Sequence, residues 1–380
     1  MYSFASSQLQ TTPGNFQLDG MMMRYSLFVP RLYNFALSLG MQPGKITPSR
    51  AFCSDESQGY PIILLAKHFG GFPFNHGRVG GIVATDRHGP HASHGKDMVI
   101  VQASHVGYDP ENATFGNYRR LQREDQCATA NCGKIFHTIE WYLDEYHYAQ
   151  DNIFLERNGD DFLITVDNQL LSAHRDEGLM LALKKLIAVA NDDRFRFIRA
   201  QSTSKTFLAS AEFITATGNA WPETKKPIGS LLTADLFHFE RHFSRDIEGL
   251  SHLEGNLIDP MPWIVTSKEP MLLAAQINTQ IEFDRTYRSI VKEHSYQNKN
   301  LLFVSGINID ISPREGQIFP LTKFVPWAAY IQKETGESYT LEQKELFEIL
   351  AKQKVGNDQQ IDLEEAIESM EHEKEIKIKF

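Results

Sequence analysis

The chain has 380 residues, of which 42% are hydrophobic and 23% are charged, the balance of a folded globular protein rather than a disordered one. Its 38 Lys and Arg against 48 Asp and Glu give a net charge of -10, which argues against nucleic acid or an anionic membrane as the main partner. No apolar run approaches the ~20 residues of a membrane span, so we expect none.

The compartment is suggested by the amino terminus and the cysteines. The first residues contain no basic segment followed by an apolar core, so we expect no secretory signal. Three cysteines (Cys53, Cys127 and Cys132) are an odd number and too few for a disulfide scaffold. We therefore expect a cytoplasmic protein, in which a cysteine is available as a metal ligand or a nucleophile.

The first predicted elements lie before residue 150. An apolar pattern over residues 25–39 predicts one or two helices, interrupted at Pro30. The apolar run 98–101 predicts a buried strand that ends at His105. Residues 134–143 predict a helix.

The second half of the chain alternates between the two element types. The runs 162–166, 263–266 and 301–304 predict strands, and residues 177–189 have the pattern of an amphipathic helix. Strands interleaved with helices favour the α/β class, with a mostly parallel sheet flanked by helices.

The carboxyl-terminal region is acidic. Thr340–Gln343 fits a helix-capping box, and Gly356 is a natural helix stop. Residues 361–380 predict either a solvated helix or a partly disordered segment. We expect one α/β domain over residues 1–340 and an acidic helical tail over residues 341–380.

Cys53 and Asp55 form the first candidate site. Extended backbone points residues i and i+2 to the same side, so Asp55 is placed to accept a hydrogen bond from a water on a metal ion held by Cys53. A buried cysteine beside a surface aspartate is the alternative.

A histidine and two further cysteines follow. His105 ends a predicted strand, and ligand sites in α/β sheets lie beyond the carboxyl ends of strands. Cys132 precedes a predicted helix start, where a thiolate is favoured, and Cys127 competes for the same role. Two cysteines with one histidine make a known catalytic zinc set, in which water takes the fourth position.

A glycine- and phenylalanine-rich segment lies between these candidates. The glycine pair that ends at Gly71 lets backbone approach closely, and Phe72 and Phe74 could wall an apolar pocket for a small uncharged substrate. The alternative is a loop whose aromatic side chains fill the core.

Other polar residues carry weaker signals. His88, His91 and His94 recur three residues apart, as in a second metal site, but their turn-rich segment favours an exposed loop. The predicted strand 301–304 leads to Asn308, Ile309 and Asp310, a segment that can place polar groups at the same sheet edge.

Four motifs in order resemble the limiting CO2-inducible B (LCIB) family, the theta-class carbonic anhydrases. They are Cys-x-Asp-Glu at 53–56, Gly-Gly-Phe-Pro-Phe at 70–74, His-Val-Gly at 105–107 and Cys-Gly at 132–133. The resemblance covers roughly residues 50–136 and marks that segment as the zinc-site region of the expected catalytic domain. It implies a fold and a site similar to those of β carbonic anhydrases, and a homodimer.

The resemblance also implies the ligands and the reaction. A Zn2+ ion would be held by Cys53, His105 and Cys132. Cys132 is preferred to Cys127 because the third ligand of the family directly precedes a glycine. Asp55 would be the catalytic acid that orients the zinc-bound water, and the reaction would be reversible hydration of CO2 to bicarbonate by zinc-bound hydroxide.

One position departs from the related β-class pattern. Those enzymes place an arginine two residues after the aspartate, where this chain has Ser57. Either Arg78, Arg87 or Arg119 supplies the pairing, or Asp55 binds the zinc itself and closes the site.

Three alternatives stay open. The chain could be a catalytically silent zinc protein that binds bicarbonate or CO2, or a metal-free cysteine hydrolase with Cys53 as the nucleophile. It could also hold a structural zinc ion, which usually has four protein ligands.

Because two thiolates cancel the charge of Zn2+, an active enzyme should hydrate CO2 faster toward alkaline pH.

Overall fold

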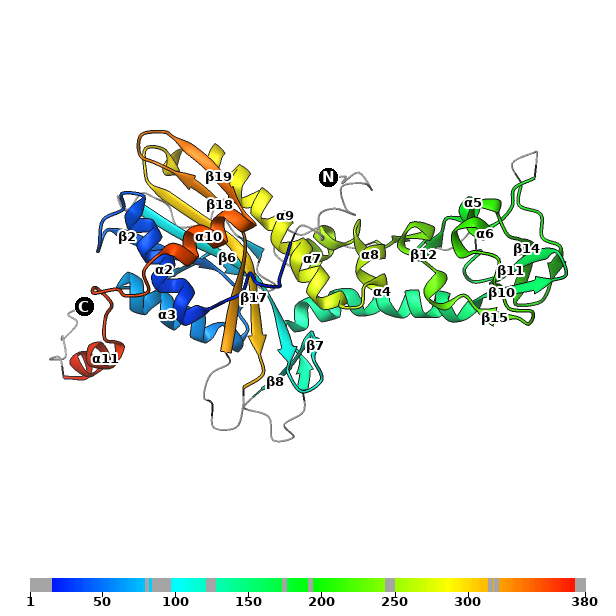
Figure 1. Ribbon diagram of the computed structural model, residues 1–380, viewed down its shortest axis with the longest axis horizontal. Coiled ribbons are helices and arrows are strands. Elements are labelled where there is room, and N and C mark those ends of the chain that lie inside the picture. Colours follow the sequence, from blue (N-terminus) through cyan, green and yellow to red (C-terminus); the bar gives the residue numbers. More distant parts are fainter. Residues whose placement is uncertain are drawn as a thin grey trace, which may run out of the picture. The chain divides into compact units, whose positions relative to one another are not determined.

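Figure 1 shows the computed structural model of the chain. The residues that it describes are 16–78, 82–83, 97–120, 128–172, 176–190, 194–242, 250–313, 317 and 321–372. They group into two compact units, one made of residues from 134–274 and the other of residues before and after that segment. We expected a single domain over residues 1–340, whereas the contacts of the described residues divide this range between two units.

One mixed sheet is the centre of the unit that contains residues before 134 and after 274. Four of its strands are parallel, in the order β17 (Leu301–Ile311), β6 (Asp97–Asp109), β2 (Ile46–Ala51) and β3 (Phe74–Asn75). Antiparallel strands extend it: β18 (Leu321–Gln332) beside β17, β1 (Met23–Arg24) and β19 (Ser338–Glu342) beside β18, and β7 (Thr114–Phe115) beside β6. Two small hairpins pair β4 (Gly77–Arg78) with β5 (Ile82–Val83) and β8 (Asn117–Arg119) with β9 (Ala128–Ala130).

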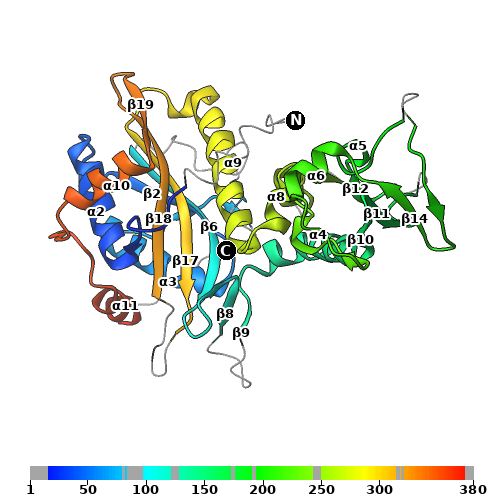
Figure 2. The same cartoon turned by 45° about the vertical axis from the view of Figure 1, so that its right-hand side comes forward.

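Helices cover both faces of this sheet, as Figures 1 and 2 show. One face carries α2 (Tyr25–Ser38), α3 (Gly59–Phe69) and α10 (Gln343–Lys352), and the other carries α9 (Pro270–Lys292), of which residues 275–292 belong to this unit. Alternate residues of β6 pack on opposite faces. Val99 and Val101 belong to the hydrophobic core under α2, α3 and α10, whereas Met98 and Ile100 belong to the core against which Phe283 of α9 packs. A strand that is covered on both faces carries apolar side chains at successive positions. This explains the continuous apolar run 98–101, from which the strand was predicted. This architecture confirms the predicted α/β class.

The unit made of residues 134–274 has its own antiparallel sheet. Its strands are ordered β13 (Arg199–Ala200), β14 (Ser204–Leu208), β11 (Asp161–Asp167), β10 (Ile153–Asn158) and β15 (Lys226–Pro227). A separate pair is formed by β12 (Gly178–Leu181) and β16 (Phe237–Glu240). The helices are α4 (Gly133–Asn152), α5 (Leu183–Leu186), α6 (Ala211–Thr217), α7 (Leu250–Leu257) and α8 (Met261–Thr266). This unit also contains the short 3-10 helices η3 (Gly229–Leu231) and η4 (Ala234–Leu236). The unit with the mixed sheet contains η1 (Glu56–Gln58) and η5 (His294–Tyr296).

Two sequence predictions gave the wrong element type. Residues 177–189 form β12 and α5 instead of one amphipathic helix, because β12 pairs with the distant strand β16, which local periodicity does not reveal. Residues 263–266 belong to helix α8 and not to a strand; an apolar run of four residues does not distinguish the two.

Two boundaries also differ from the prediction. Helix α2 is not interrupted at Pro30, because the buried residues around it are held by tertiary packing. The capping box of α10 uses Glu342 and Glu345 and not Thr340–Gln343, since β19 extends to Glu342.

The solvated helix predicted near the carboxyl end is confirmed as α11 (Leu363–Glu371), which buries no residue. None of the described helices combines the length and apolar character that crossing a bilayer requires.

Candidate metal centre

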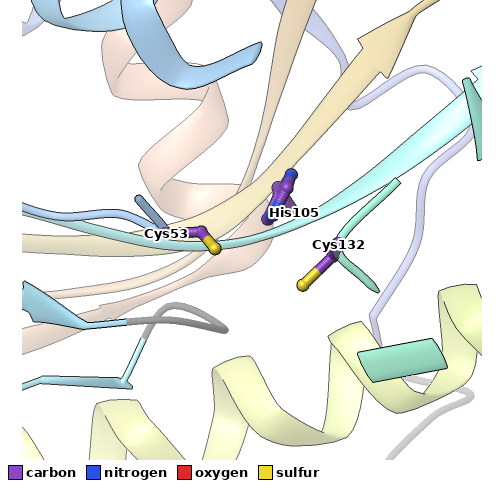
Figure 3. Close-up of side chains that lie close together, drawn as sticks. All are labelled: Cys53, His105 and Cys132. Atoms are coloured by element: carbon purple, nitrogen blue, oxygen red, sulfur yellow. The ribbon is translucent and has the colours of Figure 1, made fainter. Parts of the chain in front are cut away.

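Cys53, His105 and Cys132 lie together in the unit that contains the mixed sheet. The two Sγ atoms and an imidazole nitrogen all lie within 4.8 Å of one another. The three residues are 3%, 0% and 1% exposed, so solvent does not compete for them freely. Within the described part of the chain, neither cysteine forms a disulfide. Figure 3 shows the three side chains side by side, each carried by a separate segment of the chain.

The parallel strands β2 and β6 explain how the first two side chains meet. The last pair of their ladder is Ala51 with Gln102. After it, β2 ends and the chain leads to Cys53, whereas β6 continues to Asp109. His105 therefore lies inside β6, in the part that extends beyond β2, and the predicted strand end at this residue was wrong. The meeting point is at the carboxyl ends of parallel strands, where ligand sites of α/β sheets are found.

Cys132 directly precedes helix α4 and has an unusual backbone. Its φ angle is 49°, in the left-handed region that costs a non-glycine residue about 1–2 kcal/mol. The adjacent Asn131 is anchored by its N–H, which donates to the carbonyl oxygen of Gly116 at 2.8 Å. Backbone strain of this kind tends to occur where a side chain must be aimed at a site.

The imidazole of His105 is oriented by a carboxylate. Its Nδ1 lies 2.9 Å from Oδ2 of Asp310, a fully buried residue of the neighbouring strand β17. The other ring nitrogen, Nε2, is buried and has no hydrogen-bond partner in the part of the chain that the structure describes. A buried unpaired nitrogen is costly, and a metal ion shared with the two sulfurs would satisfy it. The donor set thus fits a metal ion.

The raised pKa values of His105 and Cys132 oppose the binding of a metal ion. Burial lowers the pKa of His105, but the charge of Cys132 and the hydrogen bond to Asp310 outweigh burial and raise that pKa well above its ordinary value. Contact with Cys53 and burial raise the pKa of the Cys132 thiol. Metal ligands must be deprotonated, so an ion has to displace protons here and would bind more weakly as the pH falls.

Asp55 is held by Arg120, which is not one of the three arginines predicted as its partner. Arg120 Nη2 lies 3.1 Å from Asp55 Oδ2, and its Nε lies 2.6 Å from Oε1 of Glu56. Arg119 instead donates to the carbonyl oxygen of Pro313 at 2.6 Å, so it is not the partner. Arg87 and the side chain of Arg78 lie outside the described residues.

The charge state of Asp55 follows from its contacts. Burial raises its pKa, but the hydrogen bond with the Glu56 carboxyl, the charge of His105, the Ser57 amide and the Arg120 charge together outweigh burial and bring the pKa below its usual value. Burial and the same Asp55 raise the pKa of Glu56. Asp55 is therefore an ionised acceptor two residues after the candidate ligand Cys53. Ser57, at the position of the expected arginine, donates its hydroxyl to Asp310 at 2.8 Å.

The predicted apolar pocket is not enclosed by its own phenylalanines among the described residues. Phe72 is 73% exposed and Phe74 is 45% exposed. Both follow helix α3, whose end at Gly70 has a left-handed φ of 76°, and Gly71 leads on from it. A role of Gly71, Phe72 and Phe74 in holding CO2 stays a prediction.

Two other sequence hypotheses fall on segments that are not described. Cys127 lies outside the described residues, and so do His88, His91 and His94. The structure therefore does not compare Cys127 with Cys132 as a ligand, nor test a second metal site.

Comparison with known proteins supports the fold. No family model matches the sequence, and no curated protein is similar to it in sequence. A crystal structure of PtLCIB4, a homologue of the limiting CO2-inducible protein LCIB, aligns with 88% of this chain and 99% of its own, with a TM-score of 0.50 at 12% identity. The PtLCIB4 H88A mutant aligns with 87% of this chain and 97% of its own, with a TM-score of 0.51 at 12% identity. The chain therefore has the fold of the LCIB homologue PtLCIB4, as the sequence resemblance implied.

Proposed function

We propose that this protein is a zinc carbonic anhydrase that catalyses the reversible hydration of CO2 to bicarbonate. The observation that carries the proposal is the convergence of Cys53, His105 and Cys132 in a chain with the fold of an LCIB homologue. Two thiolates and one imidazole are a catalytic zinc set that leaves the fourth tetrahedral position open. When bound, the ion would supply Lewis acidity that lowers the pKa of a coordinated water.

The side chains around the ligands prepare the site for this reaction. Asp55 is ionised and 10% exposed at its side chain, so it can accept a hydrogen bond from a water molecule that enters. The ion pair with Arg120 engages Asp55 Oδ2, and the hydrogen bond from the Ser57 amide engages Oδ1, so both Asp55 oxygens already have partners in the protein. This arrangement favours an open site over one that Asp55 closes. Asp55 then orients water, and Arg120 orients Asp55.

The test combines zinc content with stopped-flow CO2 hydration. The wild type should carry about one zinc per chain and hydrate CO2 above the buffer rate, increasingly so from about pH 6 to pH 9. Cys132→Ala should lose both the zinc and the activity, whereas the control Cys127→Ala should retain both.

Other outcomes point to other functions. A zinc-loaded wild type without hydration would indicate a silent zinc protein that binds bicarbonate or CO2. A protein without zinc that is inactivated by thiol alkylation would indicate a hydrolase with Cys53 as nucleophile. A homodimer and a cytoplasmic location belong to the same proposal, and light scattering of the purified chain tests the first.

A further inference from the structure

Asp310 accepts hydrogen bonds from an unusual number of groups for one buried carboxylate. Its Oδ2 accepts from Ser57 Oγ, Gln58 Nε2 and Asn131 Nδ2, each at 2.8 Å, besides its contact with His105 at 2.9 Å. Its Oδ1 accepts from the hydroxyl of Thr322 at 3.0 Å. Asp310 is 0% exposed, so protein groups alone compensate for its loss of water.

The donors to Oδ2 come from all three ligand-bearing segments. Ser57 and Gln58 belong to η1, which follows Cys53. Asn131 directly precedes Cys132, and His105 is itself a candidate ligand. One oxygen atom therefore connects the segments that must come together for a metal ion to be held.

A second group of side chains fixes the direction of these bonds. Tyr25 donates its hydroxyl to Asn308 Oδ1 at 2.7 Å, and Asn308 Nδ2 donates to Gln58 Oε1 at 2.6 Å. Gln58 must then present its Nε2 to Asp310, since its oxygen is already engaged. Asn308 and Asp310 are two residues apart on β17 and so lie on the same face of the sheet.

The same geometry determines which nitrogen of His105 is free. A carboxylate only accepts, so the Nδ1 that contacts Asp310 carries the proton of that bond. The lone pair of a neutral ring is then on Nε2, the buried nitrogen that has no partner among the described residues. Histidine ligands are commonly held in this way, with the second nitrogen donating to a carboxylate.

We propose that Asp310 is the positioning residue of the metal centre: it fixes His105 with Nε2 toward the two sulfurs and holds the Cys53 and Cys132 segments in register before an ion binds. The proposal rests on the metal centre of the proposed function, but not on its reaction. Asp310 is not one of the three candidate ligands; it acts through His105, Ser57 and Asn131.

The first test is the zinc affinity of Asp310→Asn, measured by competition with a chromophoric chelator. The amide turns one acceptor into a donor while nearly keeping its shape, and we expect zinc to bind about 10- to 100-fold more weakly. The matched control is Asn278→Ala, which removes another buried hydrogen bond, from Asn278 Nδ2 to Ser104 Oγ at 2.9 Å. Ser104 points to the opposite face of β6 from His105, so this variant should lose stability but bind zinc as the wild type does.

Wild-type affinity in a folded Asp310→Asn, or equal weakening in both variants, would overturn the assignment. A second measurement needs no variant and applies if Asp310→Asn does not fold. In zinc-loaded wild type labelled with 15N-histidine, one ring should have a protonated Nδ1 and a metal-bound Nε2. A metal-bound Nδ1 on His105 would overturn the proposal.

The outcome is separable from that of the proposed function. Zinc affinity and the ring nitrogen signals do not depend on CO2. A wild type that binds zinc through Nε2 but does not hydrate CO2 refutes the enzyme and supports the role of Asp310. A wild type that binds no zinc refutes both.

Discussion

Arg120 forms an ion pair with Asp55 across 65 residues of the chain, with Nη2 and Oδ2 3.1 Å apart. Arg120 follows strand β8 and is anchored there by hydrogen bonds from Nη1 to Thr129 Oγ1 at 3.1 Å and to the carbonyl oxygen of Ala130 at 3.3 Å. The guanidinium is thus held through Nη1 by the β8–β9 hairpin and through Nη2 by Asp55. This ion pair supplies the partner of Asp55 that Ser57 cannot supply.

The first prediction concerns Arg120→Gln. Without the guanidinium, Asp55 loses its charged partner and is free to turn toward the metal ligands, where it would occupy the position that water needs. We expect CO2 hydration to fall by about 10- to 100-fold at unchanged zinc content, because Arg120 acts through Asp55 and not as a ligand. Stopped-flow assays with metal analysis on the same samples test this.

The neighbouring Arg119 provides the control for this prediction. Its side chain is 29% exposed, similar to the 23% of Arg120, but it donates to Pro313 and lies 3.9 Å from Glu111. Arg119→Gln should therefore leave the hydration rate near that of the wild type. Equal losses in the two variants would show that the effect is one of general surface charge.

The second prediction uses the backbone of Cys132. Cys132→Ala and Cys132→Gly both remove the thiol, so neither should hold zinc. Only glycine adopts a φ of 49° without steric cost, so the metal-free Gly variant should have a free energy of unfolding about 1 kcal/mol above that of the Ala variant. Denaturant unfolding of the two variants measures the difference, and a more stable Ala variant would contradict it.

The sequence indicated the candidate ligands because their residue types are rare and their chemistry is specific. Cys53, His105 and Cys132 stand next to recognisable strand and helix ends, and the structure brings them together. The strand 301–304 and the helix after Cys132 are also confirmed, as parts of β17 and α4. Both predictions rested on local signals, although a four-residue apolar run such as 301–304 does not by itself separate a strand from a helix.

The partners of these residues were beyond sequence reasoning for a physical reason. Arg120 was not among the three arginines considered, because which arginine reaches Asp55 depends on how the β8–β9 hairpin is placed. Asp310 was noted only as a polar residue at the sheet edge, since its contact with His105 depends on the parallel register of β6 and β17. The strand over residues 178–181 was missed because its pairing is also long-range.

The third prediction concerns stability in acid. Burial lowers the pKa of His76 from 6.5 to about 3, and neither ring nitrogen has a hydrogen-bond partner among the described residues. The unfolded chain therefore binds a proton at this residue below pH 6.5 that the folded protein excludes. Stability must fall as the pH decreases from 6.5 toward 3, by about 2 kcal/mol at pH 5 from this group alone.

His76→Leu isolates this contribution. Unfolding free energies of wild type and variant, each measured at pH 7 and pH 5, give two pH-dependent losses. The loss of the variant should be smaller by about 2 kcal/mol, because leucine does not titrate. The change in packing that leucine causes affects the unfolding free energy at both pH values, so it cancels when the decreases from pH 7 to pH 5 are compared. Identical losses would mean that His76 gains a proton in the folded protein as easily as in the unfolded chain.

The last prediction concerns Gly77, whose backbone packs on the segment that leads to Cys53. A Cβ at this position would collide with the carbonyl oxygen and the nitrogen of Phe52, and these backbone atoms cannot move without moving Cys53. Gly77→Ala should therefore destabilise the protein by about 1–3 kcal/mol and weaken zinc binding by about tenfold or more. The control Gly71→Ala adds the same methyl group where, apart from its two neighbours in sequence, no atom of the described residues lies within 4 Å, and it should change neither quantity. If both variants bind zinc as the wild type does, the position of Cys53 tolerates a shift of Phe52, and the close contact at Gly77 serves packing alone.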